Sequence, residues 1–179
     1  MRKALPVLVT VLLLALQGVF GPWAGAADEY RIAAGDLLSV DVFDEPDLSL
    51  AEVRVTADGT IPFPLLERVK VAGLTAEEVS ARIKDLLLDG YLKKPRVTVS
   101  IIKYRYIYVT GEVKNPGAYN YVDGLTVEKA IALAGGFTVR GSEDKITLVR
   151  ESTSEVVKSV NKTSPISPGD IVRVGEAFF

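Results

Sequence analysis

Two closely similar segments, GLTAEEV and GLTVEKA, constrain the fold more than any other feature of the sequence. In each segment a threonine precedes an amphipathic stretch, so Thr75 and Thr126 are predicted to be the N-cap residues of two helices. Glu78 completes a capping box in the first segment, whereas Lys129 occupies that position in the second and predicts a weaker helix start. Two helices of one design predict two small modules with a shared plan. Independent convergence on a good helix start would explain the repeat equally well.

Strand signals surround the first predicted helix. The stretch YRIAAGDLLSVDVF predicts a turn and then a half-buried strand, because apolar and polar residues alternate within it. In VRVTADGTIPF, the dipeptide Asp58-Gly59 is typical of a type I′ turn, so the runs on either side are predicted to form a β-hairpin. Pro62 and Pro64 remove two backbone donors from the same side of the return strand, which predicts an edge strand. KPRVTVSI predicts another strand after the helix.

The second half of the chain repeats this order of elements. IYVTGEV and GAYNYV are predicted strands, and Pro116-Gly117 between them suits the centre of a type II turn. KITLVRE and EVVKSV predict a second hairpin, and SPGDIVRV predicts a closing strand whose GDIVRV echoes the earlier GDLLSV. Gly90 and the pair Gly135-Gly136 are predicted to end the two helices. The residues predicted to be buried are Val79, Ile83, Leu86 and Leu87 in the first helix, and Val127, Ala130, Ile131 and either Leu133 or Ala134 in the second. Together these patterns predict an α+β protein of two small modules, each with a helix packed on a small mixed sheet, in a β-grasp-like order.

The N-terminal segment predicts a secretory signal peptide over residues 1–26. Arg2 and Lys3 precede an apolar run that is shorter than the ~20 residues of a membrane-spanning helix, and AGA before Ala27 suits a signal peptidase. Cleavage would leave 19 basic residues against 23 acidic ones, so the mature chain is predicted to be mildly acidic and no nucleic acid is expected as a partner. The sequence contains no histidine and no cysteine, which excludes Ser-His-Asp and Cys-His catalysis, ordinary zinc sites and disulfides.

Several stretches, in a fixed order, carry a resemblance to a known family. YRIAAGDLLSVDVF, RVTADGTIPFPLL, VAGLTAEEV and KKPRVTVSI closely resemble the polysaccharide export domain of outer-membrane capsule and exopolysaccharide exporters of the Wza type. IYVTGEVKNPGAY, DGLTVEKAIALAGGF and ISPGDIVRV resemble the soluble-ligand-binding β-grasp (SLBB) domain that follows it in that family. The resemblance implies a polysaccharide export domain over residues 27–103 and a β-grasp domain over residues 104–179.

The resemblance also implies a function and partners. Family members are non-enzymatic components of capsular or exopolysaccharide export, and they form homo-oligomeric rings in the periplasm and outer membrane around a lumen for the polymer. They work with an inner-membrane polysaccharide co-polymerase. This chain differs from the best-known members because it has no lipidation cysteine, no second β-grasp repeat and no C-terminal amphipathic helix. We therefore expect a periplasmic protein, associated with the outer membrane, that relies on a separate outer-membrane β-barrel protein or on another export protein. The alternative is a periplasmic glycan-binding module that guides polymer without forming a channel.

No catalytic, cofactor-binding or metal-binding residues are predicted. The acidic loop with Asp41, Asp44, Glu45 and Asp47 lacks the spacing of an EF-hand and is expected to be solvated rather than to bind Ca²⁺. Glycan cleavage would need a pair of carboxylates, and no pair stands out in the sequence. An enzymatic function is therefore not expected.

The candidate sugar-contact residues are three tyrosines. Tyr104, Tyr106 and Tyr108 are predicted to lie on one strand face, where their rings and hydroxyls could contact a glycan. Cross-strand packing is the commoner role of such residues. The other residues singled out are predicted turn and cap positions: Gly35, Asp36, Asp58, Gly59, Gly73, Thr75, Gly111, Pro116, Gly117, Gly124, Thr126, Gly135, Gly136, Gly169 and Asp170.

Overall fold

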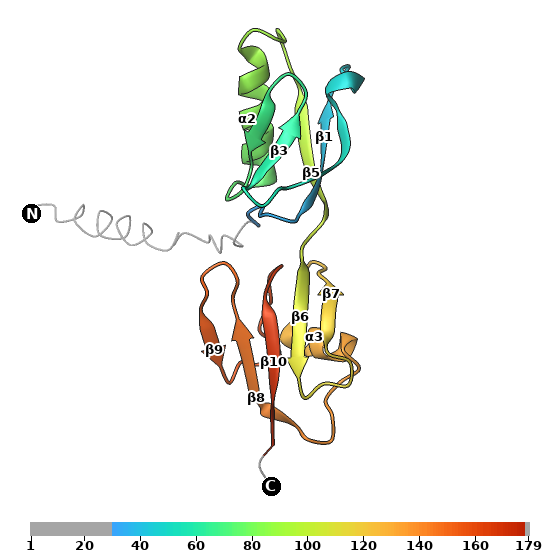
Figure 1. The fold of residues 1–179 in the computed structure, drawn as a ribbon, viewed down its shortest axis with the longest axis vertical. Coiled ribbons are helices and arrows are strands. Elements are labelled where there is room, and N and C mark those ends of the chain that lie inside the picture. Colours follow the sequence, from blue (N-terminus) through green and yellow to red (C-terminus); the bar gives the residue numbers. More distant parts are fainter. Residues whose placement is uncertain (1–29, 178–179) are drawn as a thin grey trace, which may run out of the picture. The chain divides into compact units, whose positions relative to one another are not determined.

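The computed structural model describes residues 30–177; the predicted signal peptide and Phe178-Phe179 lie outside them. From Arg31 onwards the described residues belong to one compact unit that contains two separate hydrophobic clusters. Residues 32–101 surround the first cluster and are named the first module, and residues 107–174 surround the second and are named the second module (Figure 1). The first module combines one α-helix with two small β-sheets and the second combines one α-helix with a single sheet, so the predicted α+β fold of two modules is confirmed.

The first module contains a three-stranded antiparallel sheet, a two-stranded sheet and a helix. Its elements in chain order are β1 (Leu37–Val42), the 3₁₀ turn η1 (Pro46–Leu48), β2 (Leu50–Arg54), β3 (Thr60–Phe63), β4 (Glu67–Lys70), α2 (Ala76–Leu88) and β5 (Val97–Lys103). The larger sheet has the order β2-β1-β5, and β3 pairs with β4. In the central strand β1, Leu38, Val40 and Val42 are buried, as the alternation of the sequence predicts.

The predicted hairpin on either side of Asp58-Gly59 is wrong. A tight turn does form, because the Thr56 N–H donates to the Thr60 carbonyl oxygen at 2.9 Å. Beyond this turn the chain enters two different sheets, since β2 pairs with β1 and β3 pairs with β4. Of the two central residues only Gly59 has a left-handed φ, +75°, whereas a type I′ turn needs two. Among the described strands β3 pairs only with β4, so its predicted place at a sheet edge is confirmed.

Helix α2 begins with the predicted capping box. The Thr75 hydroxyl oxygen accepts a hydrogen bond from the Glu78 N–H at 3.2 Å, and Glu78 Oε2 accepts one from the Thr75 N–H at 2.9 Å. These two bonds satisfy backbone donors that have no partner inside the helix. The helix ends at Leu88, and Gly90 follows with a φ of +94°, a conformation that favours glycine.

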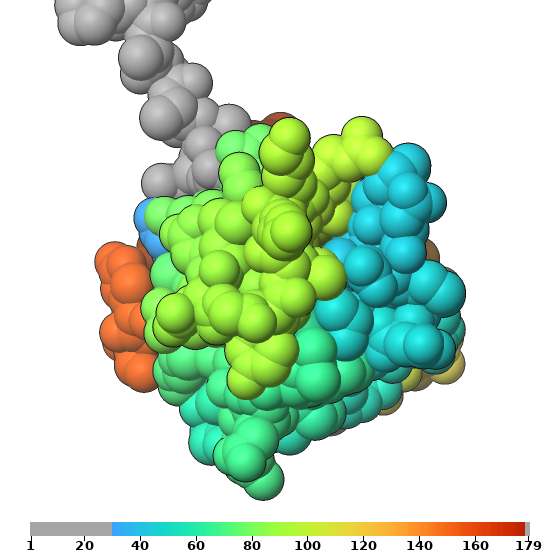
Figure 2. All heavy atoms as spheres, turned by 90° about the horizontal axis from the view of Figure 1, so that it is seen from above, coloured from blue at the N-terminus to red at the C-terminus, as the bar shows by residue number. Residues whose placement is uncertain are grey.

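The buried face of α2 is a narrow stripe. Val79, Ile83 and Leu87 recur every fourth residue and are fully buried against the sheets. Leu86 is 38% exposed, so the prediction that it faces the core is wrong, because it lies about 100° away from Leu87 around the helix axis. Figure 2 shows the end of the first module where α2 and the loop after it (yellow-green) form much of the visible surface.

The second module is built on a five-stranded mixed sheet. Its elements are β6 (Tyr106–Gly111), β7 (Gly117–Asn120), α3 (Val127–Leu133), β8 (Gly141–Val149), β9 (Val156–Lys158) and β10 (Ile171–Glu176). The strand order is β7-β6-β10-β8-β9, with β10 parallel to β6 and antiparallel to β8. Helix α3 contributes Val127, Ala130 and Ile131 to the core; Ala134 is also buried, whereas Leu133 is exposed. Within residues 30–177 neither helix has the length and apolar character needed to cross a membrane.

The connection between β6 and β7 differs from the predicted type II turn. Gly117 is the first residue of β7, pairs with Val109, and has no left-handed φ. The left-handed residue is Gly111 at the end of β6, with a φ of +84°. A Cβ atom on Gly111 would lie 2.0 Å from the carbonyl oxygen of Val174 in β10, so glycine is required where these strands meet.

Candidate functional site

The two Gly-Asp dipeptides of the sequence form two equivalent turns. In the first module Asp36 Oδ2 accepts a hydrogen bond from the Ala33 N–H at 2.8 Å, and the Asp36 N–H donates to the Ala33 carbonyl oxygen at 3.2 Å. In the second module Asp170 Oδ2 and its N–H make the same pair of bonds with Ser167, at 2.9 and 3.1 Å. Both aspartate side chains are buried. The repeated sequence therefore encodes a repeated buried-carboxylate turn at the start of β1 and of β10.

Each buried carboxylate is paired with an arginine. Asp170 Oδ2 lies 2.8 Å from Arg150 Nη1. Asp36 Oδ1 accepts a hydrogen bond from the backbone N–H of Arg105 at 3.1 Å, and Arg105 Nε lies 3.7 Å from the same oxygen. Because a buried carboxylate without a partner is costly, these arginines are needed for the turns to be stable.

Arg105 connects several segments that are distant in the sequence. It lies between β5 and β6, and its side chain is only 20% exposed. Its Nη1 donates to Glu151 Oε2 at 2.5 Å, and its Nη2 donates to the carbonyl oxygen of Pro168 at 3.0 Å. Together with the bond to Asp36, these contacts fix the chain at the point where it passes from the first module to the second.

Two of the three candidate tyrosines share a face of β6. Tyr106 and Tyr108 are 43% and 45% exposed, whereas the residues that follow each of them, Ile107 and Val109, are buried. A strand directs alternate side chains to opposite faces, which explains this pattern. Tyr104 precedes β6, so its predicted place on the same strand face is wrong. It is half-buried, and its ring packs edge-on against Tyr121 with ring centroids 5.1 Å apart. The tyrosines therefore supply two exposed rings and one packed ring.

The packed ring lies near a negative charge. Burial raises the pKa of the Tyr104 hydroxyl, and the negative charge of Asp123 adds to this effect. Burial and Asp123 raise the pKa of Tyr121 in the same way. Both hydroxyls therefore stay protonated at neutral pH and remain hydrogen-bond donors.

All three tyrosines line one surface hollow, with a volume of about 280 Å³. The other lining residues are Ala34, Gly35, Arg54, Lys103, Arg105, Glu151 and Gly169. Lys103 Nζ lies 3.1 Å from the Tyr106 hydroxyl and 5.0 Å from the centre of the Tyr106 ring. Arg54 Nη1 donates to the Gly35 carbonyl oxygen at 2.8 Å. The hollow thus combines aromatic surface, hydroxyl groups and cations, which are the groups that proteins use to hold sugars and their acidic substituents.

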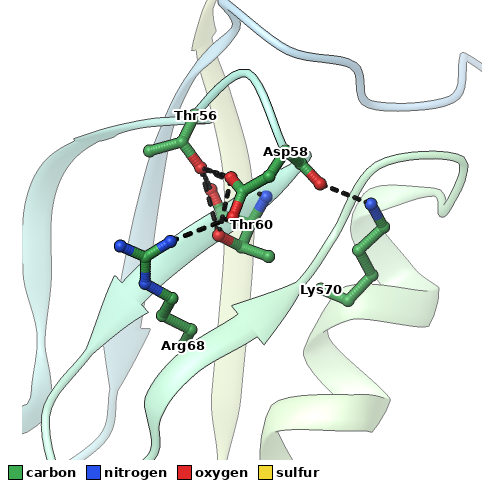
Figure 3. A network of polar contacts seen from close by, with 5 residues as sticks. All are labelled: Thr56, Asp58, Thr60, Arg68 and Lys70. Carbon is green, nitrogen blue, oxygen red and sulfur yellow. Dashed lines mark hydrogen bonds and ion pairs between the residues drawn. The ribbon is translucent and has the colours of Figure 1, made fainter.

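A second polar network lies at the turn before β3 (Figure 3). The Asp58 carboxylate accepts hydrogen bonds from the hydroxyls of Thr56 and Thr60, and Arg68 Nη1 lies 3.0 Å from Asp58 Oδ2. Lys70 Nζ donates to the Asp58 backbone carbonyl oxygen at 2.5 Å. The hydrogen bonds from the Thr56 and Thr60 hydroxyls, followed by the charge of Arg68, lower the pKa of Asp58 from 3.8 to about 2. The network is internally paired and holds the turn.

The remaining predicted motif residues lie at helix ends and turns. Gly73 and Gly124 have left-handed φ values and lie just before the N-cap residues. Thr126 accepts a hydrogen bond from the Lys129 N–H at 3.4 Å, longer than the equivalent bond in α2. Gly135 and Gly136 follow α3 with φ values of +81° and +84°, and Pro116 lies in the loop before β7.

The acidic loop after β1 lines a shallow hollow. Asp41, Asp44 and Glu45 border it together with Ser49, whose hydroxyl bonds to backbone groups of Val42 and Glu45. In the part of the chain that the structure describes, no group of three or more acidic side chains is placed to hold a metal ion.

Sequence reasoning singled out the three tyrosines and the Gly-Asp turns, but it did not single out the cations around them. Arg105 and Arg150 pair with aspartates 69 and 20 residues away. Such distant pairs leave no local signal. Arg54 and Lys103 are the last residues of β2 and β5, and charged residues are common at strand ends. Only the folded chain brings them close to the tyrosines, so their positions in the sequence do not indicate a site.

Comparison with known proteins gives two family matches that lie next to each other. Residues 24–102 match the family described as polysaccharide biosynthesis/export protein, and residues 106–158 match the SLBB domain. The chain is 35% identical to the EPS I polysaccharide export outer membrane protein EpsA of Ralstonia nicotianae over 73% of this chain and 41% of the relative. It is 32% identical to the exopolysaccharide production protein ExoF of Rhizobium meliloti over 82% of this chain and 38% of the relative. It is 29% identical to the polysialic acid transport protein KpsD of Escherichia coli, over 73% of this chain and 24% of that protein.

These matches define a class of transport proteins rather than of enzymes. The chain belongs to the family of polysaccharide export proteins and carries an SLBB domain after the export domain, as the resemblance of its sequence implies. It spans about two fifths of the length of the first curated relatives that it matches, 41% and 38%.

Proposed function

We propose that the protein is a periplasmic component, associated with the outer membrane, of capsular or exopolysaccharide export. The observation that carries this proposal is the pair of family matches, one on each module. Relatives that share the region are named for polysaccharide export or transport. The partners that we expect are the polysaccharide, an inner-membrane polysaccharide co-polymerase and a separate protein that crosses the outer membrane.

The proposal includes secretion and two functional domains. A signal peptide over residues 1–26 would be removed before Ala27, and residues 27–103 and 104–179 would form the export domain and the SLBB domain. N-terminal sequencing of the protein extracted from the periplasm tests the first part. A mature chain that begins at Ala27 agrees with the proposal, and a mature chain that retains Met1 contradicts it.

We further propose that copies of the chain assemble into a homo-oligomeric ring that surrounds a path for the polymer. A ring needs lateral contacts, and our candidate surface is the edge of β3 that pairs with no other strand in residues 30–177. Pro62 in β3 has no N–H and is exposed, so a neighbouring copy could not add a regular strand there. Leu65, just after β3, is 55% exposed. An apolar side-chain contact at this edge fits both features.

Crosslinking in the native envelope tests the ring. A photo-reactive amino acid at position 65 should give discrete homo-oligomeric bands, whereas the same amino acid at Lys84, on the exposed side of α2, serves as the control. Electron microscopy of detergent-extracted complexes should then show rings. If cells that export polymer contain only monomer with both probes, the ring is contradicted. Bands from position 84 alone would keep the assembly but contradict the proposed lateral surface.

A second candidate function is a periplasmic glycan-binding module that guides polymer without forming a channel. The tyrosine-lined hollow favours it, because a binding hollow can act in a single chain. The two functions differ in assembly: the guiding module would bind an oligosaccharide tightly as a monomer and would give no homo-oligomeric crosslinks in exporting cells.

A further inference from the structure

Three cationic residues line the hollow beside β6, Arg54, Lys103 and Arg105, against one lining carboxylate, Glu151. Two further carboxylates lie close by: Asp123 acts on Tyr104, and Asp36 is buried beside Arg105. The whole sequence, in contrast, has a formal net charge of −2. The residues that line this hollow are therefore more basic than the protein as a whole.

The three cations are not equally available to a ligand. Arg105 is committed, because its guanidinium contacts Glu151 and lies close to the buried Asp36. Arg54 and Lys103 are exposed, and their hydrogen bonds are to a carbonyl oxygen and to the Tyr106 hydroxyl, which are both neutral. Within residues 30–177, no ion pair involves Arg54 or Lys103. Two charges at the hollow thus remain without a carboxylate partner.

The exposed tyrosines provide the other half of a sugar site. The Tyr106 and Tyr108 rings can pack against the C–H face of a sugar, and their hydroxyls can bond to sugar hydroxyls. A carboxylate on the same sugar would reach a cation at the rim and form a charge-assisted hydrogen bond. Tyr106 lies directly beside Lys103, so ring and cation are placed to contact one sugar residue.

We propose that this hollow binds acidic sugar residues, so that the exported polymer is a carboxylate-bearing polysaccharide held by Tyr106, Tyr108, Lys103 and Arg54. The inference rests on the proposed export function, whose substrate class it specifies. Because both cations are exposed, each adds only a few-fold to affinity, and salt weakens the contribution. Weak contacts of this kind suit a polymer that must keep moving.

The test compares two probes with the same sugar backbone, one with charged carboxylates and one with neutral methyl esters. Purified full-length chain is titrated by calorimetry with an α-1,4-linked oligogalacturonate and with its methyl ester, at low salt and at high salt. We expect the acid to bind about ten-fold more tightly than the ester at low salt, with the preference reduced at high salt. The double variant Lys103→Gln and Arg54→Gln should lose most of this preference. Tyr108→Ala should weaken binding of both probes to a similar extent.

A matched variant excludes general charge effects. Arg82→Gln with Lys84→Gln removes two exposed cations from α2 and should leave the preference for the acid unchanged. Equal affinity for acid and ester, or equal loss in the two double variants, overturns the inference. Neither result affects the export proposal, which is tested by polymer release from a strain that lacks this gene. If that strain releases no polymer and the purified protein shows no preference for the acid, the export function stands and only the proposed substrate class is wrong.

Discussion

The backbone N–H of Arg105 donates a hydrogen bond of 3.1 Å to the buried carboxylate of Asp36, across 69 residues of sequence. The same carboxylate accepts a bond from Ala33 at the start of the first module. One side chain thus holds both the entry into β1 and the segment between β5 and β6. The hollow that we assign to sugar binding lies at this segment, so its shape depends on the Asp36 contact.

Substitution Asp36→Ala is expected to destabilise the protein by roughly 2 kcal/mol or more. It leaves the N–H groups of Ala33 and Arg105 without their acceptor and removes the carboxylate that lies close to the Arg105 side chain. Urea denaturation followed by circular dichroism measures the change in the free energy of unfolding. Asp85→Ala, at an exposed position of α2, is the control and should change stability by less than ~0.5 kcal/mol. Equal effects of the two substitutions would contradict the role given to Asp36.

Substitution Gly111→Ala is expected to cost more than about 2 kcal/mol of stability. The residue has a left-handed φ of +84°, and the added methyl group would collide with the Val174 carbonyl oxygen. Gly117→Ala is the matched control, since its Cβ would meet only a tyrosine ring atom at 4.0 Å and its φ is not left-handed. Thermal unfolding should show a clear loss for Gly111→Ala and a change within about 1 kcal/mol for Gly117→Ala. A stable Gly111→Ala variant would mean that β6 and β10 approach less closely than described.

The two helix caps should differ in strength. Thr75→Ala removes one member of a full capping box and is expected to cost about 1 kcal/mol. Thr126→Ala removes a single long bond of 3.4 Å, with no reciprocal side-chain bond, and should cost less. Chemical denaturation of both variants gives the comparison. A larger loss for Thr126→Ala would reverse the predicted order.

The Asp58 network should make stability depend on pH in the acid range. The pKa of Asp58 is lowered to about 2 in the folded protein from 3.8, so the folded state binds this proton less readily than the unfolded state. The network therefore stabilises fully above pH ~4, and its contribution is lost as the pH falls towards ~2. Asp58→Asn should be less stable than the wild type above pH ~4, and this difference should shrink at lower pH.

The cause of the shift can be tested in the same protein. Thr56→Val removes the hydroxyl that lowers the pKa of Asp58 most, so the carboxylate should titrate at a higher pH in this variant. Carboxyl-carbon NMR of the labelled protein reports that pKa directly. An unchanged titration in Thr56→Val would show that the threonine bond does not control it.

What the sequence predicted correctly is mostly local. Thr75 with Glu78 specifies a helix start within four residues, and the period of two along β6 specifies that Tyr106 and Tyr108 share one face. The hairpin at Asp58-Gly59 was wrong because a turn residue fixes the local backbone but not which strands pair beyond it. The prediction that Leu86 is buried was wrong because Leu86 and its neighbour Leu87 cannot both face a narrow core from one helix.

For the same reason, only the tyrosines of the candidate site could be predicted from the sequence, and the cations could not. The period of two in β6 indicates Tyr106 and Tyr108, but the cations beside them come from the ends of β2 and β5 and from the segment before β6. Their proximity follows from tertiary folding and not from spacing along the chain. The family was indicated by the resemblance of whole stretches of sequence, and no single residue of the hollow could indicate it.

The most direct test of the central claim is the amount of surface polysaccharide in a strain that lacks this gene. The account predicts that the deletion strain releases little or no polymer, and that the full-length chain supplied in trans restores release. Variants that fold normally but do not self-associate in the envelope should fail to restore it. Normal release of polymer from the deletion strain would contradict the account.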